Sequence, residues 1–408
     1  MTLIPQARAR DLSFDRSRID WVLVLVTGAI LVLGTLLVWS STSTNDVLTG
    51  GHPTAYLRKQ LVNIAIGLVL GAMVLVTDRR WVRILAPLVY VGSVIGLLLV
   101  LVMGSTINGS RSWLLIGGLS VQPAEFAKLA VVVGMALLVA ERTESSRQRK
   151  VGTPEVVSML LIAGLPALLI LLQPDLGTML VLSATIFGVL AAAGTPRRWL
   201  VGLASAGVLG AAVVVSAGVL KAYQINRFMA FTNPDLDPRG AGYNTTQARI
   251  AIGNGGLFGQ GLFGGSQTKS GFVPEQHTDF VFTVAGEELG LIGAGVLIAL
   301  FAVLLWRALL IAVRTDDLFG RVAAAGIACW FGFQTFQNIG MCLGIMPVTG
   351  VPLPLVSYGG SSMFASLMAI GLLLNIERSS MQPTRVERTG GAQRRRPARA
   401  GSAFSPRA

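Results

Sequence analysis

The chain is poor in the residues that build disulfides, metal centres and charged surfaces. Its 408 residues include only two cysteines and two histidines. Cys329 and Cys342 fall within one apolar stretch, so we expect small core residues there, with no disulfide and no metal site. Charged residues make up 13% of the chain, and the mean hydropathy is +0.66. These deficits exclude a secreted disulfide scaffold and an ordinary soluble enzyme.

The chain has instead many uncharged runs that are long enough to span a bilayer, for which a helix needs about 20 residues. Seven such runs cover 21–45, 60–77, 84–110, 156–174, 176–196, 199–220 and 289–306. The stretch 322–376 carries no charge over 55 residues and has room for two spans and a connection. The run at 122–140 adds one more, although it contains Glu125 and Lys128. We therefore predict an all-α polytopic membrane protein with about ten transmembrane helices.

The distribution of Lys and Arg predicts the orientation of these spans. With a cytoplasmic N-terminus, 24 of the 33 Lys and Arg residues lie in cytoplasmic segments, which is the positive-inside pattern. Both termini are then cytoplasmic: 1–20 precedes a membrane domain of 21–378, and 379–408 is a basic tail that we expect to be disordered. The net charge of +13 follows from this topology and needs no nucleic-acid partner. No small-residue cleavage site follows the first run, so we expect a retained span.

Three segments do not fit simple spans or short turns. The outer segment 104–121 is rich in Gly and Ser, and a large outer loop of about 220–276 separates spans 7 and 8. In this loop we expect helices at 223–231 and 245–252, joined by a turn and packed along the outer surface. The prolines and glycines of 344–360 rule out a continuous helix. Irregular backbone at membrane depth needs protein or a wet cavity beside it, so we predict a re-entrant outer connection there.

Three ionisable side chains lie within or beside spans. Glu125 and Lys128 are three residues apart and share a helix face. They are either a self-neutralising pair or the lining of a polar cavity where Lys128 offers a cation to a phosphate. The cost of charge in a membrane favours the cavity. Asp175 follows Pro174 at an outer turn, where both a functional role and capping of the helix beginning at Leu176 stay open.

The most informative motif is PEQHTDF at 274–280, which places Glu275, His277 and Asp279 at the outer lip of a span. On the helix that we expect to continue from Asp279, Glu287 lies about 80° round and borders the same cavity, whereas Glu288 points away. Cations on the same outer side are Arg111, Arg227, Arg239, Arg249 and Lys269. This combination suits an anionic lipid-linked substrate, because an attacking hydroxyl needs a base and a phosphate leaving group needs positive charge.

Four long motifs occur in order along 21–378. They are NGSRSWLLIGGLSVQPAEFAKLA, QPDLGTMLV, PEQHTDFVFTVAGEELGLIG and NIGMCLGIMPVTGVPLPLVSYGGSSM. Together they resemble the SEDS family (shape, elongation, division and sporulation). The chain is most similar to RodA, the elongation branch, in QARIAIGNGGLFGQG and TAYLRKQLVNIAIG. FtsW, the division branch, shares most of these motifs and stays an alternative.

This resemblance implies a peptidoglycan glycosyltransferase of the bacterial cytoplasmic membrane that polymerises lipid II at the outer face. It implies a class B penicillin-binding protein (the transpeptidase) and membrane proteins of the elongation complex as partners. It also implies that Asp279 is the catalytic residue and that Ala124 stands where Ser is usual. The candidate substrate-binding residues, from the resemblance and the residues together, are Arg111, Glu125, Lys128, Asp175, Arg249, Lys269, Glu275, His277 and Glu287.

A transfer of this kind inverts the anomeric carbon, because an α-linked donor yields a β-1,4 product. We expect Asp279 to be the general base for the acceptor hydroxyl, while Arg111 and Lys128, together with Arg249 or Lys269, hold the pyrophosphate. The sequence contains no recognisable metal cage, so Mg²⁺ or Mn²⁺ would have to be bridged by the substrate pyrophosphate. The alternatives are a lipid II flippase and a scaffold without chemistry. The candidate residues cluster on the outer half, which favours the enzyme.

Overall fold

The computed structural model describes residues 19–107, 110–116, 119–145, 151–216 and 240–380, together with isolated positions between 225 and 237. The predictions for the tail at 381–408, for four of the nine residues of the 223–231 helix and for most of the turn after it fall outside these residues. The described positions of that helix, 225, 227 and 229–231, are helical. The second helix predicted in the outer loop, 245–252, lies within α10 (Ala241–Asn254).

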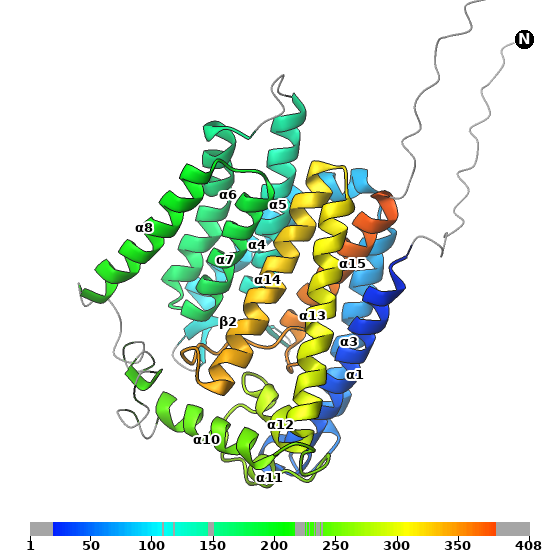
Figure 1. Cartoon of the computed structure of the whole chain (residues 1–408), viewed down its shortest axis with the longest axis vertical. Coiled ribbons are helices and arrows are strands. Elements are labelled where there is room, and N and C mark those ends of the chain that lie inside the picture. The colour runs from blue at the N-terminus through cyan, green and yellow to red at the C-terminus, as the bar shows by residue number, and fades with distance from the viewer. Residues whose placement is uncertain are drawn as a thin grey trace, which may run out of the picture.

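Ten helices of 17 residues or more form a bundle in the described part of the chain (Figure 1). They are α1 (Trp21–Ser43), α3 (Ala55–Val76), α4 (Arg79–Met103), α5 (Pro123–Ser145), α6 (Thr153–Leu172), α7 (Leu176–Ala192), α8 (Arg197–Ser216), α13 (Gly290–Arg314), α14 (Leu318–Leu343) and α15 (Gly360–Ser380). Each coincides with a predicted span. Seven are long and apolar enough to cross a membrane, and α7 is a shorter apolar helix. The fold is therefore all-α and polytopic, while the number of crossings stays a prediction.

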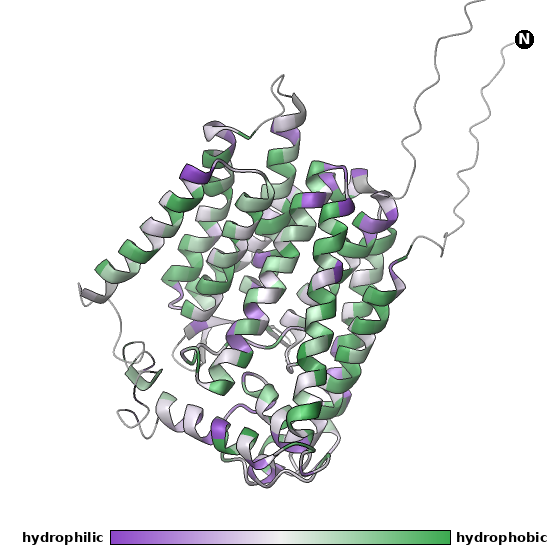
Figure 2. Ribbon diagram, viewed as in Figure 1, coloured by the Kyte–Doolittle hydropathy of each residue, from purple (hydrophilic) through white to green (hydrophobic). Residues whose placement is uncertain are grey.

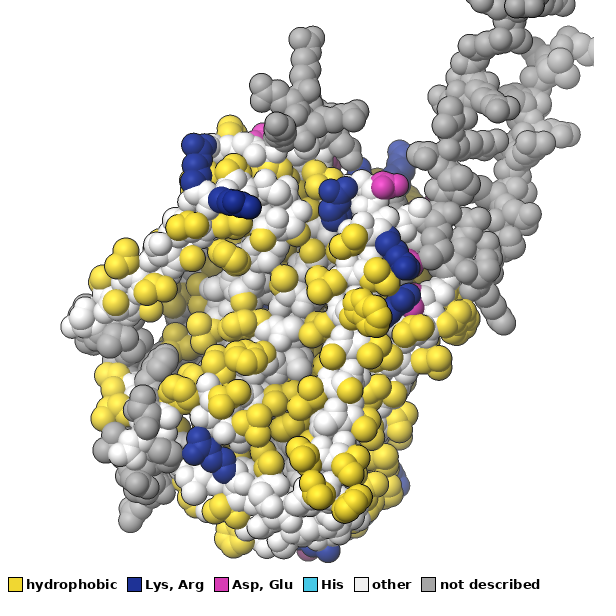
Figure 3. All heavy atoms as spheres, in the orientation of Figure 1, with side chains coloured by type: hydrophobic (Ala, Val, Ile, Leu, Met, Phe, Trp, Pro, Cys, Tyr) yellow, Lys and Arg dark blue, Asp and Glu magenta, His cyan; other side chains and the backbone are white. Residues whose placement is uncertain are grey.

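Burial separates the helices into an inner and an outer group. Within the most apolar 18 residues of each helix, 89% are buried in α5 and 83% in α15, against 17% in α3 and 28% in α4. Figure 2 shows hydrophobic residues along the helices of the bundle, and Figure 3 shows hydrophobic side chains over its flank, with Lys and Arg mainly near its ends. Polar groups on α5 therefore face protein and not lipid.

The two ends of the bundle differ. The first residue of α1 and the last of α15 lie at the same end (Figure 1). There Arg307 Nη2 pairs with Asp20 Oδ2 at 2.6 Å and Arg83 Nη2 with Asp317 Oδ1 at 3.0 Å. The opposite end carries α10 and two short helices, α11 (Ser266–Ser270) and α12 (Val281–Glu288). One more short helix, α2 (Asp46–Thr49), follows α1.

Two local features differ from the sequence expectation. The segment expected to be an irregular loop forms a three-stranded antiparallel sheet of β1 (Ser105–Ile107), β2 (Ser110–Ile116) and β3 (Leu119–Val121). The span expected to run on from Asp279 is broken, because α12 ends at Glu288 and α13 begins at Gly290, whose φ is +68°. A left-handed backbone cannot continue a helix, so the chain changes direction there.

Candidate active site

The predicted re-entrant segment, 344–360, enters the protein without forming a helix. Val351, Leu353, Leu355 and Val356 within it are each no more than 1% exposed. It packs so closely on α1 that a Cβ atom at Gly34 would lie 2.6 Å from the Cα atom of Val356. The irregular backbone is thus covered by protein, as its depth requires.

Three amide side chains on one face of α14 hold this segment in place. Gln334 Nε2 donates to the carbonyl of Pro352 at 2.8 Å, and Gln337 Nε2 donates to Thr349 Oγ1 at 2.8 Å. Asn338 Nδ2 donates to the carbonyl of Val351 at 2.8 Å. The sequence analysis missed all three residues. Their signal was the spacing of three and four residues within an uncharged span, which puts them on one helical face.

Asp279 lies where the re-entrant segment and the PEQHTDF motif meet. Its backbone carbonyl accepts a 2.7 Å hydrogen bond from Asn338 Nδ2, and its backbone N–H donates to the carbonyl of Glu275 at 3.0 Å. A Cβ atom at Gly350 would lie 3.3 Å from Asp279 Oδ2, so the glycine forms a close wall beside the carboxylate. The Asp279 side chain is half-buried. Among the described residues, no hydrogen-bond donor is assigned to its carboxylate oxygens.

The electrostatic surroundings of Asp279 favour a protonatable carboxyl group. Burial raises the pKa of Asp279 to about 7. The negative charges of Glu275 and Asp175 act in the same direction, whereas Arg227 lowers the pKa. A group with a pKa near neutrality can both take up and release a proton at physiological pH. Arg227 was noted in the sequence only as one outer cation, and its proximity could not be predicted.

Glu125 and Lys128 on α5 form a buried ion pair. Lys128 Nζ lies 2.7 Å from Glu125 Oε1 and donates to Gln334 Oε1, also at 2.7 Å. It also lies 5.1 Å from the ring centroid of Trp330. Neither charged side chain is more than 1% exposed. The ammonium is therefore engaged inside the protein, and the contact with Gln334 joins it to the face of α14 that holds the re-entrant segment.

Asp175 caps α7, as one of its two interpretations predicted. Its Oδ1 accepts from the backbone N–H of Thr178 at 3.0 Å, and its Oδ2 accepts from Thr178 Oγ1 at 2.8 Å. Gln122 Nε2 also donates to Asp175 Oδ2 at 3.3 Å. Burial raises the pKa of Asp175. The charge of Asp175 also acts on Asp279, so the cap belongs to the same electrostatic neighbourhood.

His277 is part of an aromatic cluster and is not a solvated residue. It is 8% exposed, and its ring centroid lies 5.0 Å from that of Tyr56 and 5.8 Å from that of Tyr358. Its carbonyl accepts from the backbone N–H of Tyr358 at 2.8 Å. Burial lowers the pKa of His277, against a smaller opposing effect of Glu275. The neutral ring therefore packs α3, PEQHTDF and the re-entrant segment together, while Glu275 is exposed.

Glu287 does not share a cavity with Asp279, contrary to the expectation from helix geometry. Both of its oxygens are used by α11: Oε1 accepts from the N–H of Gln267 at 2.7 Å, and Oε2 from the N–H and hydroxyl of Thr268 at 2.9 and 2.7 Å. Glu287 thus caps and anchors that short helix. Glu288 does have a separate partner, as expected, because Ser40 Oγ donates to it at 2.6 Å.

The predicted outer cations take different positions. Arg111 donates to the carbonyls of Gly104 and Val102 at 2.8 and 3.0 Å, and so caps the end of α4. Arg249 donates to the carbonyls of Leu343 and Gly344 at 3.2 and 3.0 Å, and so caps the end of α14. Lys269 is exposed at the end of α11. Substrate binding by these cations stays a prediction.

Within the described part of the chain, no group of three His, Cys, Asp or Glu side chains is placed to hold a metal ion. Glu275 and Asp175 act on Asp279 through charge, but the three do not form such a group. A divalent cation at this site would need oxygen ligands from another molecule, such as a pyrophosphate.

Comparison with known proteins identifies the family. Residues 20–382 match the family model of FtsW, RodA and SpoVE, described as cell cycle proteins. The chain is 38% identical to a probable peptidoglycan glycosyltransferase FtsW of Trichlorobacter lovleyi, covering 89% of this chain and 94% of that protein. It is 36% identical to the peptidoglycan glycosyltransferase MrdB of Escherichia coli, covering 89% and 94%. It is also 36% identical to the stage V sporulation protein E of Bacillus subtilis, covering 88% and 97%.

Solved structures support the same assignment. A chain from a study of how a peptidoglycan synthase complex coordinates polymerization and crosslinking has a TM-score of 0.74 and 34% identity, covering 90% of this chain and 99% of that one. The rod shape determining protein RodA of Thermus thermophilus has a TM-score of 0.65 and 33% identity, covering 90% and 98%. The chain therefore belongs to the FtsW, RodA and SpoVE family of cell cycle proteins, multi-pass proteins of the cytoplasmic membrane that include named peptidoglycan glycosyltransferases.

Proposed function

We propose that this chain polymerises lipid II into β-1,4 glycan strands at the outer face of the cytoplasmic membrane, with Asp279 as the general base. One observation carries the proposal. The Asp279 carboxylate is half-buried, is assigned no hydrogen-bond donor among the described residues, and has a pKa of about 7. The Glu287 carboxylate, by contrast, has both oxygens occupied by groups of α11. A carboxylate held by its backbone with a free side chain suits proton transfer.

The proposed transfer has one proton acceptor and one leaving group. The Asp279 carboxylate takes the proton from the acceptor's 4-hydroxyl as the oxygen attacks the anomeric carbon of the donor. The new C–O bond forms as the bond to the lipid pyrophosphate breaks on the opposite face, so the configuration inverts. The proton ends on Asp279, and the electron pair leaves with the pyrophosphate. A base with a pKa near the working pH is effective in this step.

Positive charge must balance the departing pyrophosphate. Arg227 is the cation whose charge acts on Asp279, and Lys269 and Arg249 lie on the same side of the bundle. Lys128 is bound to Glu125 and Gln334 in the interior, so we assign it to positioning the site. A divalent cation bridged by pyrophosphate would add to this charge, with the exposed Glu275 carboxylate as the protein group that would hold it.

The biological setting is a further proposal. The identities to FtsW, MrdB and stage V sporulation protein E are 38%, 36% and 36%, too close to separate the branches. The motif resemblance favours the elongation branch, with cell division as the alternative. A class B penicillin-binding protein is the proposed partner, because a related chain belongs to a peptidoglycan synthase complex. Other elongation-complex membrane proteins are proposed on the motif resemblance alone.

A lipid II flippase is the runner-up function. It would use the same substrate without bond chemistry, and would need polar groups along the full depth of the bilayer. The site around Asp279 gathers at the end of the bundle opposite the start of α1 and the end of α15, which supports an enzyme. The experiment below distinguishes a flippase from a polymerase.

The test is polymerisation of lipid II in detergent by the full-length chain, alone and with its transpeptidase partner. We expect glycan strands from the wild type and from Asp46→Asn, a control at an exposed carboxylate on α2, and none from folded Asp279→Asn. Polymerisation by Asp279→Asn at the wild-type rate would refute the base assignment. Scrambling of lipid II across vesicles without any glycan would support the flippase.

A further inference from the structure

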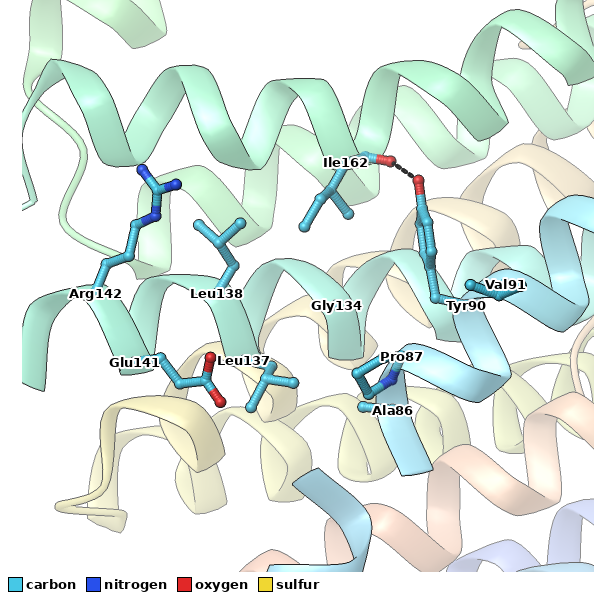
Figure 4. Close-up of a pocket in the computed structure, with 10 residues that line it drawn as sticks. All are labelled: Ala86, Pro87, Tyr90, Val91, Gly134, Leu137, Leu138, Glu141, Arg142 and Ile162. Atoms are coloured by element: carbon cyan, nitrogen blue, oxygen red, sulfur yellow. Dashed lines mark hydrogen bonds between the residues drawn. The ribbon is translucent and has the colours of Figure 1, made fainter. Parts of the chain in front are cut away.

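A second cavity lies far along the bundle from the candidate active site. It has a volume of about 310 Å³ and lies between α4, α5 and α6 (Figure 4). Its walls include Pro87 and Tyr90 of α4, Gly134 and Leu138 of α5, and Ile162 of α6. No wall residue belongs to α14, to PEQHTDF or to the re-entrant segment. Its volume is at the lower end of the range of about 300–1,000 Å³ for ligand pockets.

Small side chains and one hydrogen bond create this cavity. Gly134 has no side chain to fill it: an added Cβ atom would lie 3.4 Å from Ile162 Cγ2 and 3.7 Å from Tyr90 Cδ2. Tyr90 Oη donates to the carbonyl of Ile162 at 2.7 Å and joins α4 to α6 at one end (Figure 4). Pro87 and Val91 are exposed on the outside of α4. The cavity is therefore apolar and opens toward the membrane.

The other end of the cavity is charged. Arg142 and Glu141 both line this end and are both exposed; Figure 4 shows the Arg142 side chain extending toward α6, while the Glu141 side chain lies on the other side of α5. A second guanidinium lies at the start of α6, where Arg198 Nη2 donates to Thr153 Oγ1 at 3.2 Å. Arg197 is adjacent and also exposed. These arginines lie at the end of the bundle where α1 begins and α15 ends, which the positive-inside pattern predicts to be cytoplasmic.

The dimensions match one lipid chain in one leaflet. Gly134 and Arg142 are eight residues apart on α5, which corresponds to about 12 Å along a helix. Half of a bilayer core is about 15 Å thick. An acyl chain could therefore lie between the helices from Arg142 to Tyr90 while its headgroup stays at the interface. Basic pockets between transmembrane helices on the cytoplasmic side suit anionic headgroups.

We propose that the cavity between α4, α5 and α6 binds one acyl chain of an anionic glycerophospholipid of the cytoplasmic leaflet, with its phosphate held by Arg142. Such a lipid braces the end of α5 opposite Glu125 and Lys128. The site is independent of the glycosyltransferase proposal, because it shares no residue with it.

The test is native mass spectrometry of the delipidated full-length chain with palmitoyl-oleoyl phosphatidylglycerol, its phosphatidylcholine counterpart or a polyprenyl phosphate. We expect tighter binding of phosphatidylglycerol than of either other lipid. Arg142→Gln should weaken phosphatidylglycerol binding about fivefold, and Gly134→Leu should remove most of it by filling the cavity. The matched controls are Arg314→Gln, at an exposed arginine on α13, and Gly164→Leu, where an added side chain meets open space.

The outcomes test the identity of the lipid and the location of its site separately. Equal binding of phosphatidylcholine, or a preference for the polyprenyl phosphate, would overturn the assignment to an anionic phospholipid. Equal losses in Gly134→Leu and Gly164→Leu would overturn the location. Arg142→Gln changes an exposed side chain, so its result stands even if Gly134→Leu fails to fold. Thermal unfolding without lipid checks that each variant is folded.

Discussion

The side-chain amide of Asn338 donates a 2.7 Å hydrogen bond to the backbone carbonyl of Asp279. The same amide donates to Val351 of the re-entrant segment, so one buried side chain holds the candidate base and the wall beside it. One turn earlier on α14, Gln334 bonds both the re-entrant segment and Lys128. The ion pair on α5 is thus connected to the Asp279 site through a single face of α14.

Asn338→Leu should impair both activity and stability, because it leaves two backbone carbonyls without a donor. We expect polymerisation to fall by about 10- to 100-fold, the cost of a misplaced catalytic group. Asn375→Leu is the matched control, since Asn375 Nδ2 donates to the carbonyls of Val74, Leu75 and Thr77 at the other end of the bundle. That variant should lose stability but keep its rate per folded molecule. Equal rates in the two variants would argue against a positioning role for Asn338.

Gly350→Ala should lower activity more than its backbone strain explains. Gly350 has a φ of +72°, and an added Cβ atom would lie 3.3 Å from Asp279 Oδ2. Gly194→Ala is the control, because Gly194 has a φ of +83° in the turn after α7 with open space around it. Both variants should lose about 1–3 kcal/mol of unfolding free energy through strain. Only Gly350→Ala should slow glycan synthesis, and an equally active Gly350→Ala enzyme would mean that this wall does not matter.

The ion pair distinguishes positioning from substrate binding. Lys128→Met leaves the Glu125 carboxylate buried without its cation, which should cost about 3–5 kcal/mol of stability. Adding Glu125→Gln removes that buried charge, so the double variant should recover most of the stability and part of the activity. Unfolding in detergent and initial rates with lipid II measure the two effects. A stable double variant whose activity does not recover and whose residual rate shows a raised KM for lipid II would instead make Lys128 a pyrophosphate ligand.

Asp279→Asn should stabilise the chain at alkaline pH. The pKa of Asp279 in the folded chain, about 7, lies above its ordinary value of 3.8. The folded state therefore holds a proton that the unfolded state has released, and the stability from this group is complete below the unfolded pKa and lost as pH rises through 7. Asn does not ionise, so the Tm of Asp279→Asn should exceed that of the wild type above pH 7. This difference in Tm between Asp279→Asn and the wild type should shrink as pH falls, whereas the difference in Tm between Asp46→Asn and the wild type should not. A difference in Tm between Asp279→Asn and the wild type that is the same at every pH would contradict the raised pKa.

Hydropathy was sufficient to predict the ten long helices, because a span needs a long apolar run and few charges interrupt those of this chain. The uncharged stretch 322–376 predicted α14 and α15. The prolines and glycines within it predicted the irregular backbone between these two helices. Hydropathy could not predict the sheet at 105–121, whose strands are short and lack a clear alternation of polar and apolar residues. The break before Gly290 depends on a left-handed glycine, which a sequence pattern does not reveal.

The sequence predicted Asp279 at the centre of the site but not the residues that surround it. The motif around Asp279 was recognisable, but Asn338 and Gly350 act through contacts between segments about 60 and 70 residues away along the chain. Glu287 shows the opposite error. Helix geometry placed it near Asp279, yet its partners are backbone groups of α11, about 20 residues earlier in the chain. Partners of this kind depend on the path of a loop, which composition does not fix.

The central claim is that Asp279 removes the proton from the acceptor hydroxyl. The most direct measurement is the pH dependence of the initial rate of lipid II polymerisation by the wild type and Asp279→Asn. Because a base must be deprotonated to act, the wild-type rate should rise with pH through a midpoint of about 7. The rate of Asp279→Asn should be low and independent of pH over that range. Two results would contradict the account. One is a rise of the Asp279→Asn rate with the same midpoint as the wild type, and the other is a wild-type rate that does not change with pH.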